Sequence, residues 1–584
     1  MAVRKPREKE KIKDYALKHS AAHLMASAIL ELHPHAHLAI GPPTEDGFYY
    51  DVGNAAITQE ALPKIEAKMK EMAKKHLKFE EQEYSVAEAK KLLKHQPFKL
   101  EILGGITGKI TFYKHGNFLD LCEGPHVKDT SELKYVKLMK VAGAYWRGDE
   151  HEAMLTRVYG VVFKTREELD RYLTMLEEAA HRDHKRLGKE LDLFTFSPLV
   201  GQGLPLWTPK GTRIREKLDS FIWELRRERG YQKVTIPHLA KKELYETSGH
   251  WKKFQDDLFK VTTREGHLFV VKPMNCPHHT QIFASKPRRY REMPQRYCET
   301  TMMYRDEQSG ELSGLTRVRS ISIDDAHVFC RKDQVEQEIM AIWDIIDHFY
   351  AAFGFSLAVR FSCHDPDQFE KYLGTTEEWK TAEEQMAIVV KKRKVAYEKG
   401  VGEAAFYGPK IDFITKDSLG REWQVATIQL DFNQPARFHL TFTNEQGKEE
   451  QVVMIHAAIA GSFERFIGVL IEHLAGKFPV WLSPVQVALL TVTDRNVSFA
   501  RGIKELLEKE GMQVDLDDRS ETIAKKVREA QIQKIPYAIT IGDKEVEKKT
   551  LAIRTRDGKV EFGVGVEEFI QRLKREVEGK ERTP

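Results

Sequence analysis

The sequence predicts a multidomain protein of the α+β class, on the basis of its length, of strand patterns in its middle and of a change of rhythm near its end. A chain of 584 residues is long enough for three or four domains. Apolar and polar residues alternate in YGPKIDFITKD and WQVATIQLDF, which predicts antiparallel strands with one face towards a ligand. After WLSPVQVALLTV, strands and helices alternate, which predicts a small mixed or parallel sheet.

Composition excludes several classes of protein. The 92 basic and 88 acidic side chains leave a net charge of +4, so any contact with nucleic acid must come from local patches. Five cysteines, an odd number without a C-x-x-C pair, indicate reduced thiols in a cytosol. No stretch approaches the roughly 18 apolar residues of a membrane span, and the charged start lacks the core of a signal peptide. We expect a cytoplasmic protein with no membrane partner.

The N-terminal third carries two pairs of chemically active side chains. After a basic tail at residues 1 to about 14, a helix places His19 and His23 four residues apart on one face. Cys122 and His126 repeat that spacing in LCEGPHV. A lone helical pair of this kind is most often an ordinary surface or core feature, whereas two pairs in one segment, with GPPTEDGFYYDV between them, indicate a site.

The remaining elements follow from periodicity and turn residues. A charged helical run from about 150 to 190 is expected to be a linker, and LPLWTPKGTRIREKLDSFIWELRRERGYQKVTIPHL predicts a turn, a long amphipathic helix and a strand. Helices are expected at 334–354 and 377–400. In the last domain, strands are expected in VQVALLTV, MQVDLD, YAITIG and LAIRTR, and helices at 497–510, 522–533 and 567–578.

The segment 305–327, RDEQSGELSGLTRVRSISIDDAH, predicts two strands joined by a mobile turn. Arg305 and Arg317 suit a polyphosphate, because a guanidinium offers bidentate donors and stays charged. Glu307 is placed to accept from an exocyclic amine, and Asp325 to sit beside an amino or hydroxyl group. The alternative is a hairpin with a solvated charged turn, and these residues alone do not decide between the two.

Three distant residues have the chemistry of a zinc site. Cys276 in KPMNCPHH, His327 and His456 in VVMIHAAIAGSFERFIG supply one thiolate and two imidazoles, which would leave a fourth position open for substrate. Ligands spread this widely have no diagnostic spacing. Taken singly, each is more often a buried cysteine or a satisfied core histidine.

The order of the motifs resembles one enzyme family over nearly the whole chain. Arg305-x-Glu307 with its loop, and GSFERFIG with Gly461 and Arg465, resemble motifs 2 and 3 of the class II aminoacyl-tRNA synthetases, while GYQKVTIP resembles motif 1. Together with MNCP, DDAH, FYGPKIDF and WQVATIQLDF, they resemble the threonyl-tRNA synthetases. No G-x-x-x-x-G-K-[ST] loop or KMSKS-like run occurs, so phosphate binding must fall to arginines.

The resemblance implies three domains and a ligase. They are an α+β editing domain with its linker helix (1–185), a class II antiparallel-sheet catalytic domain (186–482) and an α/β anticodon-binding domain (483–584). The implied enzyme is a homodimer that uses ATP to form threonyl-adenylate and transfers threonine to tRNA(Thr). It needs one Zn²⁺ per subunit and Mg²⁺ with ATP.

The resemblance also implies roles for residues in the catalytic domain. The implied catalytic residues are Arg305, Arg465, His250 and Lys410. The implied ATP-binding residues are Arg305, Glu307, Arg317, Gln424 and Arg465. The implied threonine-binding residues are Asp325, Tyr407, Gln429 and Ser462, and the implied zinc ligands are Cys276, His327 and His456.

A second, hydrolytic site is expected on chemical grounds. A pocket for threonine cannot strongly exclude serine, because one methyl group is worth only about 1–3 kcal/mol. The resemblance implies that the N-terminal domain hydrolyses Ser-tRNA(Thr) by acid–base and positioning chemistry without a required zinc, although the residue types alone would suggest zinc. The implied editing residues are His19, His23, Lys99, Asp120, Cys122, His126 and Tyr50, and the implied anticodon-reading residues are Arg528, Glu545 and Arg554.

Several features depart from the family pattern. The chain starts at the editing domain, without the small ubiquitin-like domain of full-length bacterial members, so we expect editing without that domain's contacts. His278 stands where Gly is usual, Ile323 replaces a polar residue near the amino acid, and Val425 and Ser520 replace a small or polar residue and an Asn. Two alternatives stay open: a non-catalytic tRNA- or mRNA-binding regulator, and a ligase for another amino acid.

Overall fold

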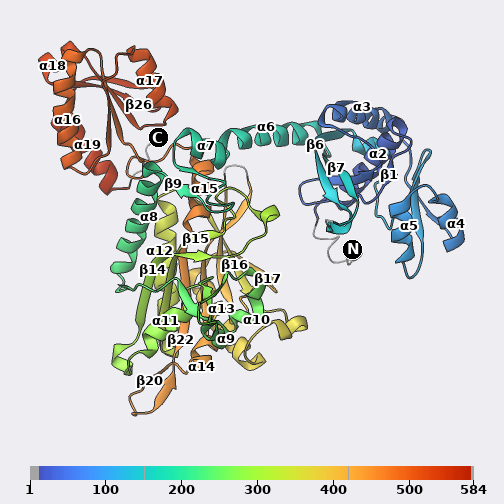
Figure 1. The fold of residues 1–584 in the computed structure, drawn as a ribbon, viewed down its shortest axis with the longest axis horizontal. Helices are drawn as coiled ribbons and strands as arrows, with labels where there is room; N and C mark the ends of the chain where they lie inside the picture. Colours follow the sequence, from blue (N-terminus) through green and yellow to red (C-terminus); the bar gives the residue numbers. More distant parts are fainter. Residues whose placement is uncertain (1–11, 150, 418–419, 581–584) are drawn as a thin grey trace. The chain divides into compact units, whose positions relative to one another are not determined.

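The computed structural model describes residues 12–149, 151–417 and 420–580, and most of the predicted basic tail lies outside these ranges. The chain divides into two compact units after residue 177. The division falls inside α6 (Arg166–Arg182), a charged helix in the stretch where a helical linker was expected. The expected start of that helix at about 150 was wrong, because the strand β7 (Met154–Phe163) precedes α6. Figure 1 shows the elements of each unit in sequence colours.

A four-stranded antiparallel sheet forms the base of the N-terminal unit, and α2 (Tyr15–Leu32) and α3 (Leu62–Ala73) pack against it. Every residue of α2 from Leu17 to Ile29 is buried, as expected for a helix that is apolar on most sides. His19 and His23 therefore lie inside the unit rather than on its surface. The strand order is β1 (His37–Leu38), β2 (Phe48–Gly53), β7 (Met154–Phe163), β6 (Tyr135–Tyr145).

A smaller three-stranded sheet lies just before Cys122 and His126 in the chain. Its strands and neighbouring helices are β3 (Glu80–Glu83), β4 (Thr111–His115), β5 (Phe118–Leu121), α4 (Val86–Leu92) and α5 (Pro97–Gly104). Cys122 and His126 lie in the loop after β5, so the helical interpretation of their spacing was wrong. Gly124 has a positive φ of 64° and Pro125 lacks an N–H group, and both features oppose a helix.

The second unit is built on an eight-stranded sheet, and its six central strands are antiparallel, which confirms the predicted fold class. The two edge strands pair in parallel. The order is β10 (Gln232–Lys233), β14 (Gln295–Tyr304), β15 (Ser320–Cys330), β22 (Val453–Ser462), β19 (Glu422–Asp431), β18 (Lys410–Lys416), β16 (Leu357–Cys363), β17 (Tyr397–Val401).

Four long helices pack beside this sheet and bury its largest core. They are α8 (Pro209–Arg227), α12 (Val335–Ala351), α13 (Thr376–Arg393) and α15 (Phe463–Leu474). The helix expected at 377–400 was too long. It ends at Arg393 because Lys394 adopts a left-handed conformation (φ 54°), and the following segment forms β17 instead.

Shorter elements surround the sheet. The helices are α7 (His184–Glu190), α9 (Lys242–Ser248), α10 (His250–Phe254), α11 (Cys276–Ala284) and α14 (Asn433–Arg437). The strands are β8 (Phe194–Thr195), β9 (Leu206–Trp207), β11 (Leu239–Lys241), β12 (Lys260–Thr262), β13 (Leu268–Val271), β20 (Thr441–Thr443) and β21 (Glu449–Gln451).

The C-terminal part contains a five-stranded mixed sheet in the order β24-β23-β25-β26-β27. The predicted strands and helices are present as β23 (Val487–Thr491), β24 (Val514–Asp517), β25 (Tyr537–Ile541), β26 (Thr550–Thr555), α16 (Val497–Lys509), α17 (Ile523–Ile532) and α19 (Val566–Glu578). Prediction missed α18 (Asp543–Lys548) and the edge strand β27 (Val560–Gly565). Two glycines and mostly exposed side chains weaken the strand signal of β27.

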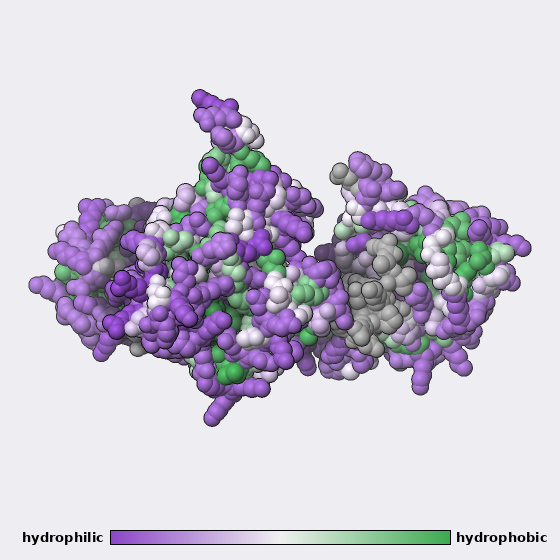
Figure 2. Space-filling view, turned by 90° about the horizontal axis from the view of Figure 1, so that it is seen from below, coloured by the Kyte–Doolittle hydropathy of each residue, from purple (hydrophilic) through white to green (hydrophobic). Residues whose placement is uncertain are grey.

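Figure 2 shows one face on which polar side chains dominate and apolar residues form separate small areas. Among the described residues, no helix combines the length and apolar character needed to cross a bilayer.

Candidate active site

Strand register brings the predicted catalytic-domain residues together. His327 on β15 lies opposite His456 on β22, which lies opposite Gln429 on β19, which in turn lies opposite Lys410 on β18. Directly opposed side chains share one face of a sheet, so one row crosses four strands. The neighbouring row on the same face contains Asp325, Ala458, Thr427 and Asp412.

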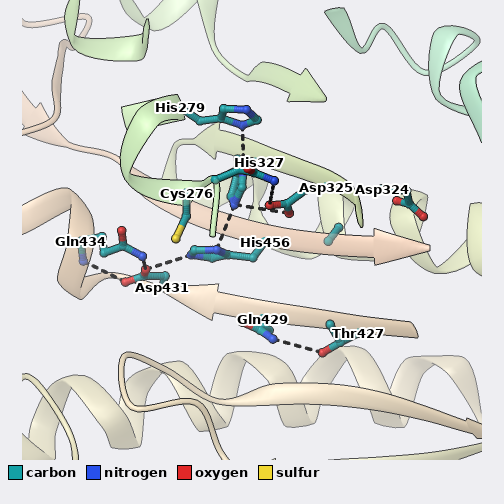
Figure 3. Close-up of polar contacts among 12 residues, drawn as sticks. Cys276, His279, Asp324, Asp325, His327, Thr427, Gln429, Asp431, Gln434 and His456 are labelled. Atoms are coloured by element: carbon teal, nitrogen blue, oxygen red, sulfur yellow. Dashed lines mark hydrogen bonds and ion pairs between the residues drawn. The ribbon is translucent and has the colours of Figure 1, made fainter. Parts of the chain in front are cut away.

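Cys276, His327 and His456 have the geometry of an open metal centre (Figure 3). One potential ligand atom of each lies within 4.8 Å of the other two, and all three residues are buried. His327 Nε2 and His456 Nδ1 are 3.1 Å apart. Two nitrogens bound at about 2.0–2.1 Å to one tetrahedral zinc would be roughly 3.4 Å apart. The donor set and its spacing therefore fit zinc.

Burial controls the charge of these ligands. It raises the pKa of the Cys276 thiol well above its usual value, with nearby Asp325 adding to the effect. Burial also lowers the pKa of His327, and neighbouring His456 lowers it further. The imidazole is therefore in the neutral form that binds metal, while the thiolate form requires a compensating cation.

Two further residues that the sequence analysis missed contact the ligands (Figure 3). His456 Nε2 lies 2.9 Å from Asp431 Oδ2, and His327 Nδ1 lies 2.7 Å from His279 Nδ1. The sequence does contain a signal for each. Asp431 follows Gln429 by two residues on the same strand, and His279 lies three residues after Cys276 on α11.

A cavity of about 400 Å³ opens beside the metal ligands. The predicted threonine residues Asp325, Tyr407 and Gln429 line it, as does Ile323. Tyr407 Oη donates to Gln429 Oε1, and the Tyr407 ring stacks on the His456 ring with centroids 4.8 Å apart. A small polar molecule bound to the metal position would thus meet a carboxylate and an amide beside several apolar side chains, Ile323 among them.

A cationic side chain without a direct polar partner among the described residues borders the same cavity. The Arg305 guanidinium has neither a hydrogen-bond nor an ion-pair partner among the described residues, and burial lowers its pKa. The pKa of Arg465 is lowered by partial burial and then by nearby Arg305 and Arg317. Arg317 pairs with Glu307 and with Glu311, at 2.8 Å each. An incoming polyphosphate would relieve the repulsion among the three guanidinium groups.

His250, the predicted proton relay, also lines the cavity. Its Nδ1 lies 2.8 Å from Ser248 Oγ, and its Nε2 lies 4.0 Å from Cys276 Sγ. Burial, with His456 and Arg305 nearby, lowers the pKa of His250 to about 3. The imidazole is therefore neutral at physiological pH and can accept a proton.

Six of the predicted residues lie outside the lining of this cavity: Glu307, Arg317 and Arg465, described above, and Lys410, Gln424 and Ser462. Lys410 Nζ and Gln424 Nε2 both donate to the Asp412 carboxylate, which holds them along one face of β18 and β19. Ser462 caps α15, because its Oγ accepts from the Arg465 N–H at 3.2 Å. In this structure Ser462 positions Arg465, and a contact with threonine is not observed.

The predicted editing side chains meet in the N-terminal unit. Cys122 Sγ lies 3.4 Å from His19 Nε2 and 3.3 Å from His126 Nε2, and His126 Nδ1 lies 2.9 Å from Ser20 Oγ. The His23 ring lies 4.5 Å from the His126 ring. By distance alone, His19, His23, Cys122 and His126 could also hold a metal ion.

Asp120 forms a second polar centre beside these side chains. Its carboxylate accepts from Tyr50 Oη at 2.5 Å and from Lys99 Nζ at 2.7 Å, and His23 Nε2 lies 3.8 Å away. Burial lowers the pKa of His23, and His126 lowers it further, so the ring is neutral. A cavity of about 430 Å³ adjoins both centres, which gives a neutral base and a charged carboxylate access to one bound molecule.

A third acidic and histidine cluster, formed by Asp183, His184 and Glu472, is not a metal centre. His184 Nδ1 donates to Glu472 Oε1 at 2.6 Å, and its Nε2 accepts from the Leu315 N–H at 3.0 Å. No ring lone pair remains for a cation. His184 instead ties α7 to α15 and to the loop that carries Arg317.

Comparison with known proteins identifies the family. The chain is 46% identical over 567 residues to a threonine–tRNA ligase of Cytophaga hutchinsonii, which covers 96% of this chain and 88% of that protein. It is 47% identical over 569 residues to the corresponding ligase of Rubrobacter xylanophilus, covering 96% and 89%. The chain belongs to the threonine–tRNA ligase family.

Three family models match separate parts of the chain. Residues 259–474 match the tRNA synthetase class II core domain (G, H, P, S and T), and residues 486–576 match an anticodon binding domain. Residues 110–159 match the threonyl and alanyl tRNA synthetase second additional domain. A solved RNA-binding domain of the threonyl-tRNA synthetase from Cryptosporidium parvum aligns with a TM-score of 0.64 and 36% identity, covering 67% of this chain and 98% of that one.

The anticodon-reading residues predicted for this threonine–tRNA ligase family member lie on three different elements. Arg528 lies on α17, Glu545 on α18 and Arg554 on β26. Glu545 caps its own helix by accepting from the Gly542 N–H at 3.0 Å. No hydrogen bond or ion pair joins the three within the described part of the chain, so their role stays a prediction.

His115 of the editing unit gives a prediction about pH. Both ring nitrogens are buried without a hydrogen-bond partner among the described residues, and burial lowers its pKa to about 4. The unfolded chain, with a histidine pKa near 6.5, binds more protons between these values. The free energy of unfolding should therefore fall, by up to about 3 kcal/mol from this group, as the pH drops from about 6.5 through about 4.

His115→Phe should remove this part of the acid sensitivity, since Phe79 and Phe118 already pack against the ring with centroids 4.8 and 5.0 Å away. Urea unfolding of the full chain at pH 7.5 and pH 5 measures the effect. Equal losses in wild type and variant would contradict it.

Proposed function

We propose that the sheet cavity activates threonine with ATP and transfers it to tRNA(Thr), and that the N-terminal cavity hydrolyses Ser-tRNA(Thr). One observation carries the first part: the ligand set Cys276, His327 and His456 opens into the same cavity as the unpaired guanidinium of Arg305. An amino-acid position and a phosphate position thus lie side by side. Aminoacylation of tRNA(Thr) by the full-length protein with threonine and ATP tests it.

The amino-acid end of the cavity selects threonine through its amine and hydroxyl. Cys276, His327 and His456 would hold one zinc ion, which supplies a Lewis-acidic position when bound. Asp325 and Gln429 accept from and donate to the polar groups of the substrate, and Tyr407 holds Gln429 in place. Valine has the same shape without the hydroxyl, so it leaves these buried polar groups unpaired and is rejected.

Arginines and Mg²⁺ stabilise the adenylation step. The threonine carboxylate attacks the α-phosphorus of ATP, and pyrophosphate leaves. Arg305 and Arg465 bind the phosphoryl oxygens on which charge develops. Arg317 takes the γ end, which requires it to leave Glu307. The same movement frees the Glu307 carboxylate to accept from the adenine amine.

His250 serves the transfer step. Its Nδ1 is engaged by Ser248 Oγ, so Nε2 is the nitrogen available to a ribose hydroxyl. An imidazole with a pKa of about 3 releases a proton soon after accepting it, so it can relay a proton but does not stay charged. The 2′-hydroxyl of the terminal adenosine is the group that it would relay from.

The second cavity corrects serine. Threonine and serine differ by one methyl group, so the first cavity discriminates only about 10 to 200-fold. Neutral His23 and the Asp120 carboxylate activate and orient a water at the ester, while Cys122, His19 and His126 position the ribose end. This proposal assigns a role to each of these side chains without a metal.

The full-length protein should deacylate Ser-tRNA(Thr) and spare Thr-tRNA(Thr). His23→Ala should lower serine release by roughly 10²–10⁴-fold, the usual contribution of a general base, with aminoacylation unchanged. His35→Ala, an exposed histidine beyond α2, is the matched control. Release of serine at the wild-type rate by His23→Ala would exclude His23 as the base.

The remaining proposals concern assembly and location. We propose a homodimer formed through the motif 1 region around α8, with tRNA(Thr) read by the C-terminal domain, and domain limits at 185 and 482. Cys276, Cys298, Cys330 and Cys363 are free thiols, which supports a cytoplasmic location. Sedimentation equilibrium of the full-length protein tests the dimer.

A further inference from the structure

We propose that His279 and Asp431 are positioning residues that determine which ring nitrogens of His327 and His456 face the metal position. The inference rests on the proposed zinc site. It concerns two residues to which the sequence motifs gave no role. Its basis is a continuous chain of polar contacts through both imidazole ligands, from Asp431 to His456, from His456 to His327 and from His327 to His279 (Figure 3).

Asp431 fixes the proton of His456. The carboxylate is buried at the end of β19. Its Oδ1 accepts from the backbone N–H groups of Asn433 at 2.8 Å and Gln434 at 2.9 Å, and its Oδ2 accepts from Gln434 Nε2 at 2.8 Å. These donors keep the carboxylate as an acceptor, so His456 Nε2 must carry the proton. His456 Nδ1 then presents a lone pair towards His327.

His279 determines the proton of His327. The two Nδ1 atoms are 2.7 Å apart, so one proton lies between them. If His327 donates it, His327 Nε2 presents a lone pair to His456 Nδ1 at 3.1 Å. Two facing lone pairs at that distance require a cation between them. This tautomer is the metal-binding one, and in it His279 Nδ1 is the acceptor.

The opposite tautomer is complete without a metal. His279 Nδ1–H then donates to His327 Nδ1, and His327 Nε2–H donates to His456 Nδ1. Conversion to the metal-binding form moves the shared proton from His279 to His327 Nδ1, and the proton released from His327 Nε2 is taken up at His279 Nε2. The total number of protons on the two imidazoles does not change. His279 Nε2 is buried without a hydrogen-bond partner among the described residues, so its lone pair is free to accept that proton.

The experiment compares two variants of His279 whose side-chain amides replace different ring nitrogens. In His279→Asn the amide oxygen takes the place of Nδ1, whereas in His279→Gln it takes the place of Nε2. Zinc affinity of the full-length proteins is measured by competition with a chromophoric chelator. His279→Gln should lose roughly 10–100-fold in affinity, the usual effect of removing an outer partner of a ligand, and His279→Asn should stay within about threefold of wild type.

Controls separate positioning from folding. His278→Gln changes the adjacent buried histidine of α11, whose ring nitrogens have no hydrogen-bond partner among the described residues, and should leave zinc affinity unchanged. In Asp431→Asn the amide oxygen stays on the backbone N–H groups of Asn433 and Gln434, so the amide N–H₂ group faces His456 Nε2. This favours the tautomer of His456 that is protonated at Nδ1, and zinc affinity should fall as it does in His279→Gln. Nitrogen-15 spectra of histidine-labelled wild type should show His327 protonated at Nε2 without zinc and at Nδ1 with zinc.

The outcomes distinguish this inference from the proposed function. Wild type that binds no zinc would overturn the metal site itself and the inference with it. Wild type that binds zinc, with His279→Gln equal to it, would overturn only the role of His279. Should His279→Gln fail to fold, the nitrogen-15 spectra decide, and a His327 tautomer that zinc does not change would refute the proposal.

Discussion

Cys276→Ser is expected to abolish zinc binding and threonine-dependent ATP–pyrophosphate exchange together. The thiolate is one of three buried ligands, and a serine hydroxyl at that position stays protonated and binds zinc poorly. The loss should exceed the roughly 10–100-fold that outer partners of a ligand contribute. Metal analysis of the purified protein and exchange assays on the same sample measure both quantities.

A matched substitution shows whether the effect is local. Cys363 on β16 is also buried and free but lies outside the ligand cluster, so Cys363→Ser should keep both zinc and exchange. If Cys276→Ser binds as much zinc as wild type, Cys276 is not a required ligand, and zinc at this site does not explain the selectivity for threonine. Loss of zinc with normal exchange would separate the metal from threonine activation.

Arg305→Ala is expected to depress threonine-dependent exchange by about 10²–10³-fold, the cost of removing one preorganised donor from a developing charge. Thermal stability should change little, because the guanidinium has no hydrogen-bond or ion-pair partner in the described part of the chain and its removal relieves repulsion with Arg465. Exchange rates and thermal unfolding of the same preparation test both halves.

Arg296 provides the opposite case on the strand that precedes Arg305. Its guanidinium makes two 2.7 Å bonds to buried Glu338, and breaking such a pair costs about 3–5 kcal/mol. Arg296→Ala should therefore lower stability while the folded protein keeps its exchange activity. If Arg305→Ala instead unfolds the protein and leaves exchange per folded molecule intact, Arg305 is structural.

Much of the site was predictable because strands have a fixed period. His327, His456 and Gln429 were identified from their motifs, and alternation along YGPKIDFITKD and WQVATIQLDF correctly indicated antiparallel neighbours. Register then places opposed residues on one face without further information. The multidomain α+β fold class and the family resemblance are both confirmed.

Spacing places Asp431 on the strand face of Gln429 and His279 on the helix face of Cys276, but it does not tell which ligand each of them contacts. His279 meets His327 only because α11 lies against β15, and Asp431 meets His456 because β19 ends there. Nothing in the sequence indicated that Lys410 and Gln424 would share the Asp412 carboxylate. A spacing of four residues predicts a helix at Cys122 and His126. The same spacing also fits a turn that folds back at Gly124 and Pro125, and the structure contains this turn.

The most direct measurement is ATP–pyrophosphate exchange by the full-length, zinc-loaded protein with each of the twenty amino acids. We expect exchange with threonine, weaker exchange with serine by roughly 10 to 200-fold, and far less with valine, because valine cannot fill the hydroxyl position. Exchange with none of them would indicate a tRNA- or mRNA-binding regulator. Exchange that is fastest with another amino acid would mean that Ile323 has changed the specificity of the cavity, and either result would contradict assignment of this site to threonine.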